Sequence, residues 1–253
     1  MTDIFKIKGR VALVTGSSRG IGRAIAQALA QAGAVVGVHG VKESKALDEA
    51  VEELRALGGT AEPLTGDLAS SEEVAILARR CRETIGAPDI LILNASIQTY
   101  MPLENFSAAE LEREYAVNVR SSFELVKEFL PDMKAKKWGR ILAIGSVNQW
   151  KPSPRLPVYA SSKAALSNFM LSCARHNSQF GITANNLAPG VIVTDRNREA
   201  LSDQDFSDKV MAGIPAGRFG KPDDCAGLAL LLCSDAGAYI TGADIPVDGG
   251  MSI

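Results

Sequence analysis

Short apolar runs alternate with helix-period segments along almost the whole chain, and this alternation constrains the fold more than any other feature. We expect strands at Val11–Thr15, Ala34–Val38, Ala61–Leu64, Ile90–Leu93, Arg140–Gly145, Thr183–Leu187 and Asp244–Val247. The first, fourth and fifth runs lack polar–apolar alternation, as strands covered on both faces do. Helical patterns follow the first three runs, at Gly22–Ala32, Lys45–Leu57 and Ser70–Ile85. Repeated strand–helix units predict an α/β fold, a doubly wound and mostly parallel sheet of seven strands with helices on both faces.

Composition and charge exclude several classes of protein. Of 253 residues, 46% are hydrophobic and 22% charged, with a formal net charge of −2, so a full core is expected. Scattered charges, no apolar run of ~18 residues and no signal-peptide pattern predict neither nucleic-acid nor membrane binding. The four cysteines form no C-x-x-C pair and the two histidines lie far apart, which predicts no metal site and a cytoplasmic location. No linker or repeat is visible, so we expect one domain over residues 1–253.

A glycine-rich turn joins the first expected strand to the first expected helix. The segment reads Thr15-Gly16-Ser17-Ser18-Arg19-Gly20-Ile21-Gly22. Glycine adopts positive φ readily and lets a phosphate approach the backbone, while a helix N-terminus offers free N–H groups to a pyrophosphate. Tight turns use glycine too, but the strand–turn–helix context favours a dinucleotide. We predict cofactor contacts at Gly16, Ser18, Arg19, Gly20, Ile21 and Gly22.

The end of the second strand bears on which dinucleotide is bound. No acidic residue stands at its tip, His39-Gly40-Val41-Lys42, to bond the ribose 2′-hydroxyl of NAD. Arg19 and Lys42 are able to pair with a 2′-phosphate, although both also suit a solvated surface. We predict that NADP(H) is favoured over NAD(H), with His39 and Lys42 among the cofactor residues. Asp67 and Asn94 end the next two strands, where they would bond adenine and ribose or serve as turn residues.

Four polar residues suggest proton transfer beside the nucleotide. Tyr159 and Lys163 are four apart and share one face of a helix. A neighbouring ammonium favours the phenolate, so we expect it to lower the pKa of Tyr159 from its usual ~10 toward the working pH. Ser146 follows the fifth strand, where its hydroxyl can hold the same substrate oxygen. Asn118 stands in an apolar stretch, as a satisfied core amide or a functional group. Each alone is ordinary, and only their joint occurrence behind the glycine-rich turn predicts catalysis.

Together these residues resemble the short-chain dehydrogenase/reductase family, of the compact single-domain type. The similarity runs essentially end to end, through Thr15–Gly22, Asp67-Leu68, Leu93-Asn94-Ala95, Asn118, Ser146, Tyr159 and Lys163, Pro189-Gly190 with Thr194, Ile240-Thr241-Gly242 and Asp248-Gly249-Gly250. It implies a Rossmann-type domain and an NAD(P)-dependent oxidoreductase that interconverts a secondary alcohol and a ketone. Hydride transfer itself belongs to the cofactor.

The resemblance also implies roles for individual residues. Tyr159 would be the general acid–base, Lys163 its partner and a ribose ligand, and Ser146 the anchor of the substrate oxygen. Asn118 would hold a water that links Lys163 to solvent. Further cofactor contacts are implied at Asp67, Leu68, Asn94, Ala95, Tyr159, Lys163, Pro189, Gly190, Ile192 and Thr194. The family implies a homotetramer, or a dimer, formed through the helices around 115–134 and 159–180 and through the last strand.

The substrate is less constrained. The family normally has glycine where this chain has Ser96, and a side chain there lies near cofactor and substrate. We predict substrate contacts at Ser96, Gln98, Ser146, Asn148, Gln149, Arg155, Val191 and Arg196. Their polar and cationic character suggests a small polar substrate, such as a sugar, sugar acid or keto acid, unless they are merely solvated loop residues.

Two alternatives stay open. The segment Pro215–Pro222 is similar to that of 3-oxoacyl-[acyl-carrier-protein] reductases, and a basic cluster at Lys134, Lys136, Lys137 and Arg140 would suit an acidic carrier, or be an ordinary basic helix end. The second alternative is a catalytically silent sensor that binds a dinucleotide. Such proteins usually lose the tyrosine or the lysine, whereas here all four catalytic positions are filled.

Overall fold

Seven parallel strands form one sheet. The computed structural model of the chain describes residues 4–253, and of residues 199–200 only the backbone. The strands are β1 (Val11–Val14), β2 (Val35–Gly40), β3 (Thr60–Thr65), β4 (Ile90–Leu93), β5 (Gly139–Ile144), β6 (Ile182–Pro189) and β7 (Asp244–Val247). Their order is β3-β2-β1-β4-β5-β6-β7 and every pairing is parallel. The predicted fold class is confirmed, and the order reverses between β1 and β4, where such sheets bind ligands.

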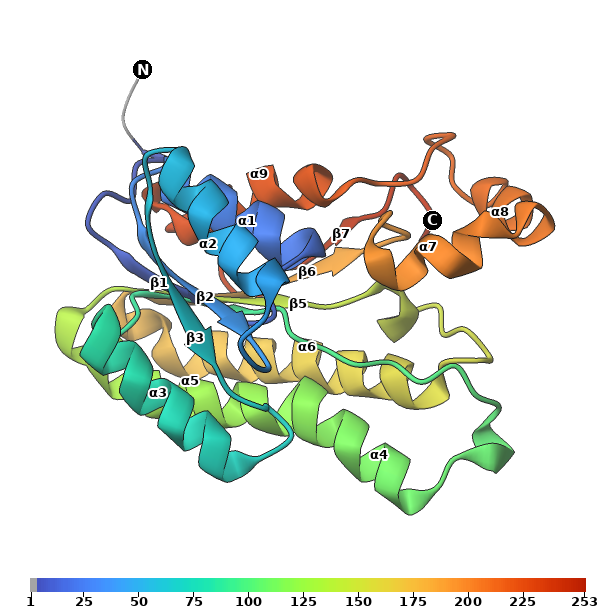
Figure 1. The fold of residues 1–253 in the computed structure, drawn as a ribbon, viewed down its shortest axis with the longest axis horizontal. Coiled ribbons are helices and arrows are strands. Elements are labelled where there is room, and N and C mark those ends of the chain that lie inside the picture. Colours follow the sequence, from blue (N-terminus) through green and yellow to red (C-terminus); the bar gives the residue numbers. More distant parts are fainter. Residues whose placement is uncertain (1–3) are drawn as a thin grey trace.

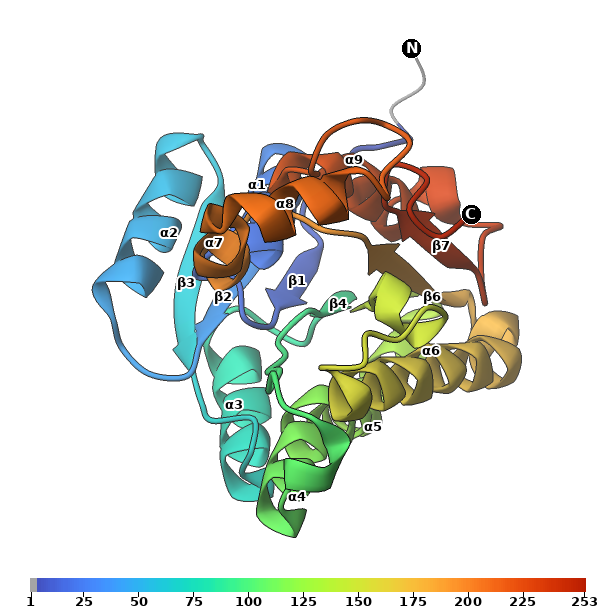
Figure 2. The ribbon, with the colours of Figure 1, turned by 90° about the vertical axis from the view of Figure 1, so that its right-hand side faces the viewer.

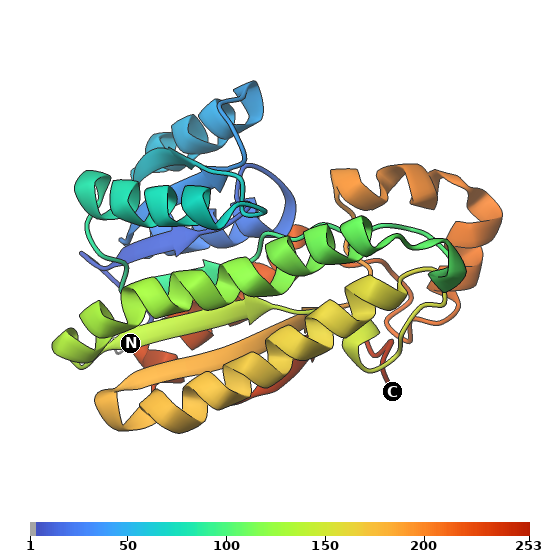
Figure 3. The same cartoon turned by 90° about the horizontal axis from the view of Figure 1, so that it is seen from below.

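Helices cover both faces of the sheet (Figure 1). One layer contains α1 (Gly20–Gln31), α2 (Lys45–Ala56) and α9 (Pro222–Cys233). The other contains α3 (Ser71–Thr84), α4 (Ala108–Tyr115), α5 (Ser121–Lys136) and α6 (Pro157–Asn177), which lie together when the molecule is seen from below (Figure 3). A π-helical turn, Ala116–Arg120, joins α4 to α5. Within residues 4–253, no helix is long and apolar enough to cross a membrane.

The apolar strands are explained by two cores, one on each side of the sheet. In β1, Val14 packs into the core beneath α1, whereas Leu13 packs into the core that contains Phe129 of α5. Successive strand residues point to opposite faces, so a strand buried on both sides must be apolar throughout. Each such side chain removed fully from water contributes roughly 1.5–3 kcal/mol.

The observed elements differ from the predicted ones mainly at their ends. Strand β2 continues beyond Val38 because His39 and Gly40 pair with Leu64 and Thr65 of β3. Strand β6 likewise extends to Pro189, which pairs with Val247. These extensions depend on a neighbouring strand, which local sequence patterns do not report.

The carboxyl ends of the strands lie at one edge of the sheet, viewed end-on in Figure 2. Helices α7 (Asp195–Ser202) and α8 (Gln204–Met211) lie over this edge, as do the segment that precedes α6 and the one that follows β4. Residues 149–157, rich in proline and basic residues, and residues 191–206, rich in charge, follow strands without forming regular strand–helix units, and both lie where ligands bind in this architecture.

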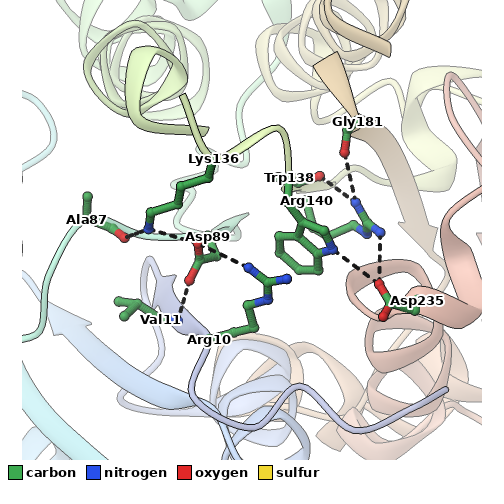
Figure 4. A network of polar contacts seen from close by, with 10 residues as sticks. Arg10, Val11, Ala87, Asp89, Lys136, Trp138, Arg140, Gly181 and Asp235 are labelled. Carbon is green, nitrogen blue, oxygen red and sulfur yellow. Dashed lines mark hydrogen bonds and ion pairs between the residues drawn. The ribbon is translucent and has the colours of Figure 1, made fainter. Parts of the chain in front are cut away.

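The opposite edge of the sheet is held by a polar network (Figure 4). The Asp89 carboxylate accepts hydrogen bonds from the Val11 N–H at 3.0 Å and from Lys136 Nζ at 2.8 Å. The Arg140 side chain is 3% exposed and donates to the carbonyls of Gly139, Gly181 and Ser234. Of the basic cluster weighed as a carrier-docking surface, Arg140 is buried and therefore does not belong to it, whereas Lys136 is partly exposed and pairs with Asp89. The basic cluster also lies at the edge of the sheet opposite the one that contains Tyr159.

Candidate active site

The glycine-rich turn packs directly against the end of β4. Gly16 and Gly20 have φ of 63° and 60°, values that favour glycine. A Cβ added to Gly22 would lie 2.4 Å from Asn94 Nδ2 and 2.7 Å from the Gly16 carbonyl. The N-cap of α1, Arg19, makes no side-chain capping hydrogen bond. Its side chain thus leaves the first N–H groups of α1 uncapped, and the turn fits a pyrophosphate.

His39 supports this turn from behind. Its ring is buried, Nδ1 accepts a hydrogen bond from the Gly16 N–H at 3.0 Å, and Nε2 bonds the Gly66 carbonyl at 3.0 Å. An imidazole that accepts at one nitrogen and donates at the other is neutral. Burial lowers the pKa of His39 to about 4, which fits this form. The structure therefore gives the predicted cofactor residue His39 a supporting position, with its ring nitrogens already occupied.

Asn94 has a similar supporting position. Its Nδ2 donates to the carbonyls of Thr15 at 2.8 Å and Gly16 at 3.0 Å. The Thr15 hydroxyl accepts from the N–H groups of Asn94 and Ala95. The hydroxyl of Ser17 donates to Val14 and accepts from the His39 N–H. Thr15 and Ser17 are residues that the motif contains but to which sequence reasoning assigned no role.

The remaining predicted adenosine-side residues lie along the same edge. Arg19 and Lys42 are both exposed. Asp67 Oδ1 accepts from the Ala69 N–H at 2.9 Å, so its carboxylate forms a turn of the kind weighed as the alternative. The Leu68 side chain is in the core, which leaves only its backbone for a ligand.

Tyr159, Ser146 and Lys163 come together at the carboxyl end of β5. Ser146 and Tyr159 are each 7% exposed and Lys163 is 1% exposed. The Ser146 hydroxyl lies close enough to the Tyr159 phenol to lower its pKa. Lys163 Nζ donates to the Ile144 carbonyl at 2.6 Å and lies 5.5 Å from the centre of the Tyr159 ring. The helical spacing of Tyr159 and Lys163 does place them side by side on α6.

The electrostatics differ from the sequence-based expectation. The pKa of Tyr159 is raised, because burial outweighs the effects of the Arg196 charge and of the nearby Ser146 hydroxyl. Burial also lowers the pKa of Lys163 to about 7, with the Arg196 charge acting in the same direction. The prediction of a lowered tyrosine pKa is therefore wrong for the protein without cofactor, because desolvation disfavours the phenolate more than the nearby cations favour it.

Asn118 lies in the π-helical turn and is fully buried. Its Oδ1 accepts from the Ile97 N–H at 2.8 Å, and its Nδ2 donates to the Ile97 carbonyl at 2.9 Å and to Ser162 Oγ at 3.0 Å. The side chain thus joins the loop after β4 to α6, one residue before Lys163. The amide is hydrogen-bonded at both its oxygen and its nitrogen, as a satisfied core group would be, and a functional role for Asn118 stays a prediction.

The loop after β6 brings the other cofactor residues toward the turn. Gly190 is tightly constrained, since an added Cβ would lie 2.8 Å from Asp248 Cα. Ile192 is buried and forms a parallel bridge with Gly220. The Thr194 methyl lies 3.4 Å from where a Cβ of Gly20 would stand. This loop and the glycine-rich turn therefore face each other across the switch point.

The predicted substrate residues differ in what their side chains contact. Arg196 of α7 donates from Nη1 to Ser96 Oγ at 3.1 Å and from Nη2 to the Ser96 carbonyl at 2.5 Å, so it joins α7 to the loop after β4. Asn148 donates to Ser146 Oγ at 3.3 Å. The Gln149 amide instead turns inward and donates to Asp244 at 2.7 Å. Three more lie around the edge, with Arg155 exposed and the other two partly buried: Gln98, Val191 and Arg155.

Sequence reasoning missed Glu114, whose buried carboxylate acts electrostatically on Tyr159 and Lys163. A signal was present, since Glu114 is a charged residue four positions before Asn118, where a helix would turn it toward the same side.

The chain is similar to known proteins over nearly its full length. A family model described as enoyl-(acyl carrier protein) reductase matches residues 16–252. L-rhamnose 1-dehydrogenase (NAD(P)(+)) of Sphingomonas sp. (strain SKA58) is 33% identical, over 98% of this chain and 98% of its own.

Solved structures are similar as well. A 3-oxoacyl (acyl-carrier-protein) reductase from Agrobacterium tumefaciens C58 with NADP bound is 41% identical, with a TM-score of 0.94 over 99% of this chain and 97% of its own. A gluconate 5-dehydrogenase from Burkholderia cenocepacia J2315, in complex with NADP and tartrate, is 34% identical, with a TM-score of 0.92 over 98% and 97%. Similarity of this extent means that the chain belongs to the short-chain dehydrogenase/reductase family of NAD(P)-dependent oxidoreductases.

Proposed function

We propose that the chain interconverts a secondary alcohol and a ketone, with NADP(H) as the preferred cofactor and a small polar molecule as the substrate. The observation that carries this proposal is the buried Tyr159 phenol, which lies close enough to Ser146 for that hydroxyl to lower its pKa and beside Lys163, at the same sheet edge as the glycine-rich turn. The catalytic residues we propose are Ser146, Tyr159 and Lys163, with Asn118 holding the loop after β4 against α6.

The proton chemistry follows from the environment of Tyr159. When bound, the cofactor gives or accepts the hydride. Tyr159 gives its phenolic proton to the carbonyl oxygen during reduction and takes the hydroxyl proton during oxidation, while Ser146 donates a hydrogen bond to the same oxygen. Because burial raises the pKa of Tyr159, the protonated phenol dominates in the free chain and is ready for carbonyl reduction. Oxidation needs the phenolate, which depends on nearby positive charge.

A Tyr159→Phe variant tests this role. We expect kcat to fall by roughly 10²–10⁴-fold, the usual contribution of general acid–base catalysis, with little change in NADPH affinity. Tyr239, which is fully exposed, provides the matched control as Tyr239→Phe. Turnover by Tyr159→Phe at the wild-type rate would overturn the proposal.

The preference for NADP(H) rests on the cations at the adenosine end of the site. Arg19 and Lys42 are exposed near the turn and the end of β2, and neither forms an ion pair with another described residue. Both are therefore able to pair with a 2′-phosphate. Replacing both with alanine should raise the KM for NADPH far more than the KM for NADH. An equal effect on the two cofactors would remove this assignment.

For the substrate, two similarities point in different directions. The gluconate 5-dehydrogenase structure contains tartrate, a small dicarboxylate, and the Arg196 guanidinium at the site edge would suit an anion. The 3-oxoacyl reductase of higher identity supports the alternative, reduction of 3-oxoacyl groups. A panel of polyols, sugar acids and keto acids against acetoacetyl thioesters separates them. Turnover of thioesters alone would end the small-polar-substrate proposal.

We further propose that the chain is cytoplasmic and forms a homotetramer through the exposed face of α5 and α6 and through β7. All four cysteines are buried and unpaired, as suits a reducing compartment. Phe123 of α5 and Leu171 of α6 are 52% and 53% exposed, and the Phe123 ring packs on Phe169 at 5.7 Å. Light scattering should give four times the chain mass and a smaller species for Leu171→Glu. A monomeric wild type would contradict the assembly.

A further inference from the structure

Glu114 is a carboxylic acid sealed inside the protein near the proposed catalytic residues. Its side chain is 0% exposed, and neither carboxylate oxygen has a hydrogen-bond partner among the described residues. Thr99 approaches closely enough to lower its pKa, but short of full hydrogen-bond geometry. Burial of a charge without a partner is costly, so its presence here calls for a role. The proton transfer proposed above does not use it.

Helix α4 packs on α6, which contains Tyr159 and Lys163, and the charge of Glu114 acts on both residues. Tyr115, the next residue, donates from its hydroxyl to Ser161 Oγ at 3.0 Å. Asn118, one turn further along, donates to Ser162 Oγ at 3.0 Å. These two serines lie between Tyr159 and Lys163 on α6. The helical segment is therefore joined to the stretch that contains the catalytic pair by the residue next to Glu114 and by a residue one turn after it.

Charged groups from each neighbouring element act on this centre. Lys163 and Tyr159 come from α6, and Arg196 comes from α7, where Ser96 holds its guanidinium. Tyr100, on the loop after β4, also acts on Tyr159. The negative charge of Glu114 raises the pKa of both Lys163 and Tyr159, whereas Arg196 lowers both. Glu114 and Arg196 thus have opposite effects on the pKa values of Lys163 and Tyr159.

We propose that Glu114 is a positioning residue that sets the protonation of the Tyr159–Lys163 pair and hence the pH range in which the enzyme works. This inference rests on the acid–base role proposed above for Tyr159. When ionised, Glu114 stabilises the Lys163 ammonium and disfavours the Tyr159 phenolate. Burial raises the pKa of Glu114 itself to about 7, so its own charge changes near neutral pH. Once protonated, Glu114 no longer stabilises the Lys163 ammonium and no longer disfavours the Tyr159 phenolate. Acid therefore protonates Lys163 and Tyr159 less readily than it would if Glu114 stayed ionised.

The charge of Lys163 gives a readout that needs no substrate. Carbon-13 labelling at lysine Cε allows Lys163 to be followed by NMR in the intact protein, with a Lys163→Arg variant to assign the signal. The wild-type midpoint is expected near pH 7, the value to which burial brings the pKa of Lys163. In Glu114→Gln the midpoint should fall by about one pH unit, the effect of one charge several ångströms away at an effective dielectric near 20. An unmoved midpoint overturns the proposal.

The pH profile of kcat/KM, measured with NADP(H) and the best substrate of the panel above, gives the matching functional test. The limb for alcohol oxidation should move to lower pH in Glu114→Gln, because the phenolate forms more readily. Glu114→Asp keeps the charge and should keep the wild-type limb. Glu112→Gln, an exposed acid on the same helix, is the matched control and should leave the profile unchanged.

A second variant guards against misfolding, and two outcomes for Tyr159→Phe keep the inference distinct from the proposed function. If Glu114→Gln fails to fold, Glu114→Leu removes the charge without leaving an amide unpaired, and the same shift must appear in both readouts. If Tyr159→Phe is fully active, the acid–base role fails whatever Glu114 does. If Tyr159→Phe is inactive but the Glu114→Gln profile coincides with wild type, only the role of Glu114 fails.

Discussion

His39 shows how burial selects the charge state of a residue that links two segments. Its neutral ring accepts from the Gly16 N–H and bonds the Gly66 carbonyl, so protonation would break the first of these bonds. Burial lowers the pKa of His39 from 6.5 to about 4. The glycine-rich turn is therefore held by a hydrogen bond that depends on pH.

We expect stability to fall in acid through His39. Below about pH 6.5 the unfolded chain takes up a proton that the folded chain takes only near pH 4, so the free energy of unfolding decreases across this window. The decrease is about 2 kcal/mol at about pH 5 and about 3 kcal/mol once both states are protonated. Urea unfolding at several pH values, in wild type and His39→Gln, measures it. His176→Gln, at the exposed histidine, should retain the wild-type pH dependence, and an identical dependence in His39→Gln would contradict this account.

At the scale of elements, the β1–α1 turn and the end of β4 form one unit. Thr15 and Asn94 join them by side-chain hydrogen bonds, and Gly22 allows the close approach of the two segments. The glycines thus serve the packing of protein on protein as well as the approach of a phosphate.

Gly22→Ala should therefore destabilise the free chain before any cofactor binds. The added methyl would lie 2.4 Å from Asn94 Nδ2 and 2.7 Å from a backbone oxygen, and we expect a loss of about 1–3 kcal/mol. Gly227→Ala is the contrast, since nothing lies within 4 Å of its added methyl in the interior of α9, and it should stabilise by about 0.5–1 kcal/mol. Urea melts and NADPH titrations measure both variants. Wild-type stability and affinity in Gly22→Ala would refute the close packing.

In the whole molecule, the proposed catalytic residues and a stabilising polar network lie at opposite edges of the sheet. The carboxyl edge gathers partly exposed polar groups around Tyr159, whereas the opposite edge is stapled by Asp89, Arg140 and Trp138 (Figure 4). There the Trp138 ring lies between two guanidiniums, 3.8 Å from Arg10 and 4.2 Å from Arg140. These contacts join β1, β4, β5 and the chain after α9.

Asp89→Ala should destabilise the protein by about 2 kcal/mol without changing KM or kcat. It removes a carboxylate that is 6% exposed and accepts from both Val11 and Lys136. Asp132→Ala breaks a surface pair with Arg82 and should cost less than about 1 kcal/mol. Denaturant unfolding and steady-state kinetics check both. A change in KM or kcat for Asp89→Ala would show that the two edges are coupled.

The sequence alone predicted most of the fold because its signals are local. Apolar runs of Ile90–Leu93 and Asp244–Val247 match β4 and β7 at both ends. The spacing of Tyr159 and Lys163 predicted their common helix face, and family resemblance supplied their neighbours. Strand ends such as His39-Gly40 were missed because a partner strand, not the local pattern, extends them.

The sequence by itself determined the periodicity of the apolar residues, the positions of the glycines and the spacing of the reactive groups. These features depend only on neighbours along the backbone. Only the tertiary structure decided which charges are buried and what they face. Arg140, weighed as part of a docking surface, lies inside the protein, the charge of the buried Glu114 acts on the catalytic pair, and the pKa of Tyr159 is raised rather than lowered. Desolvation and charge coupling depend on segments brought together by the order of the strands, and no local pattern contains that order.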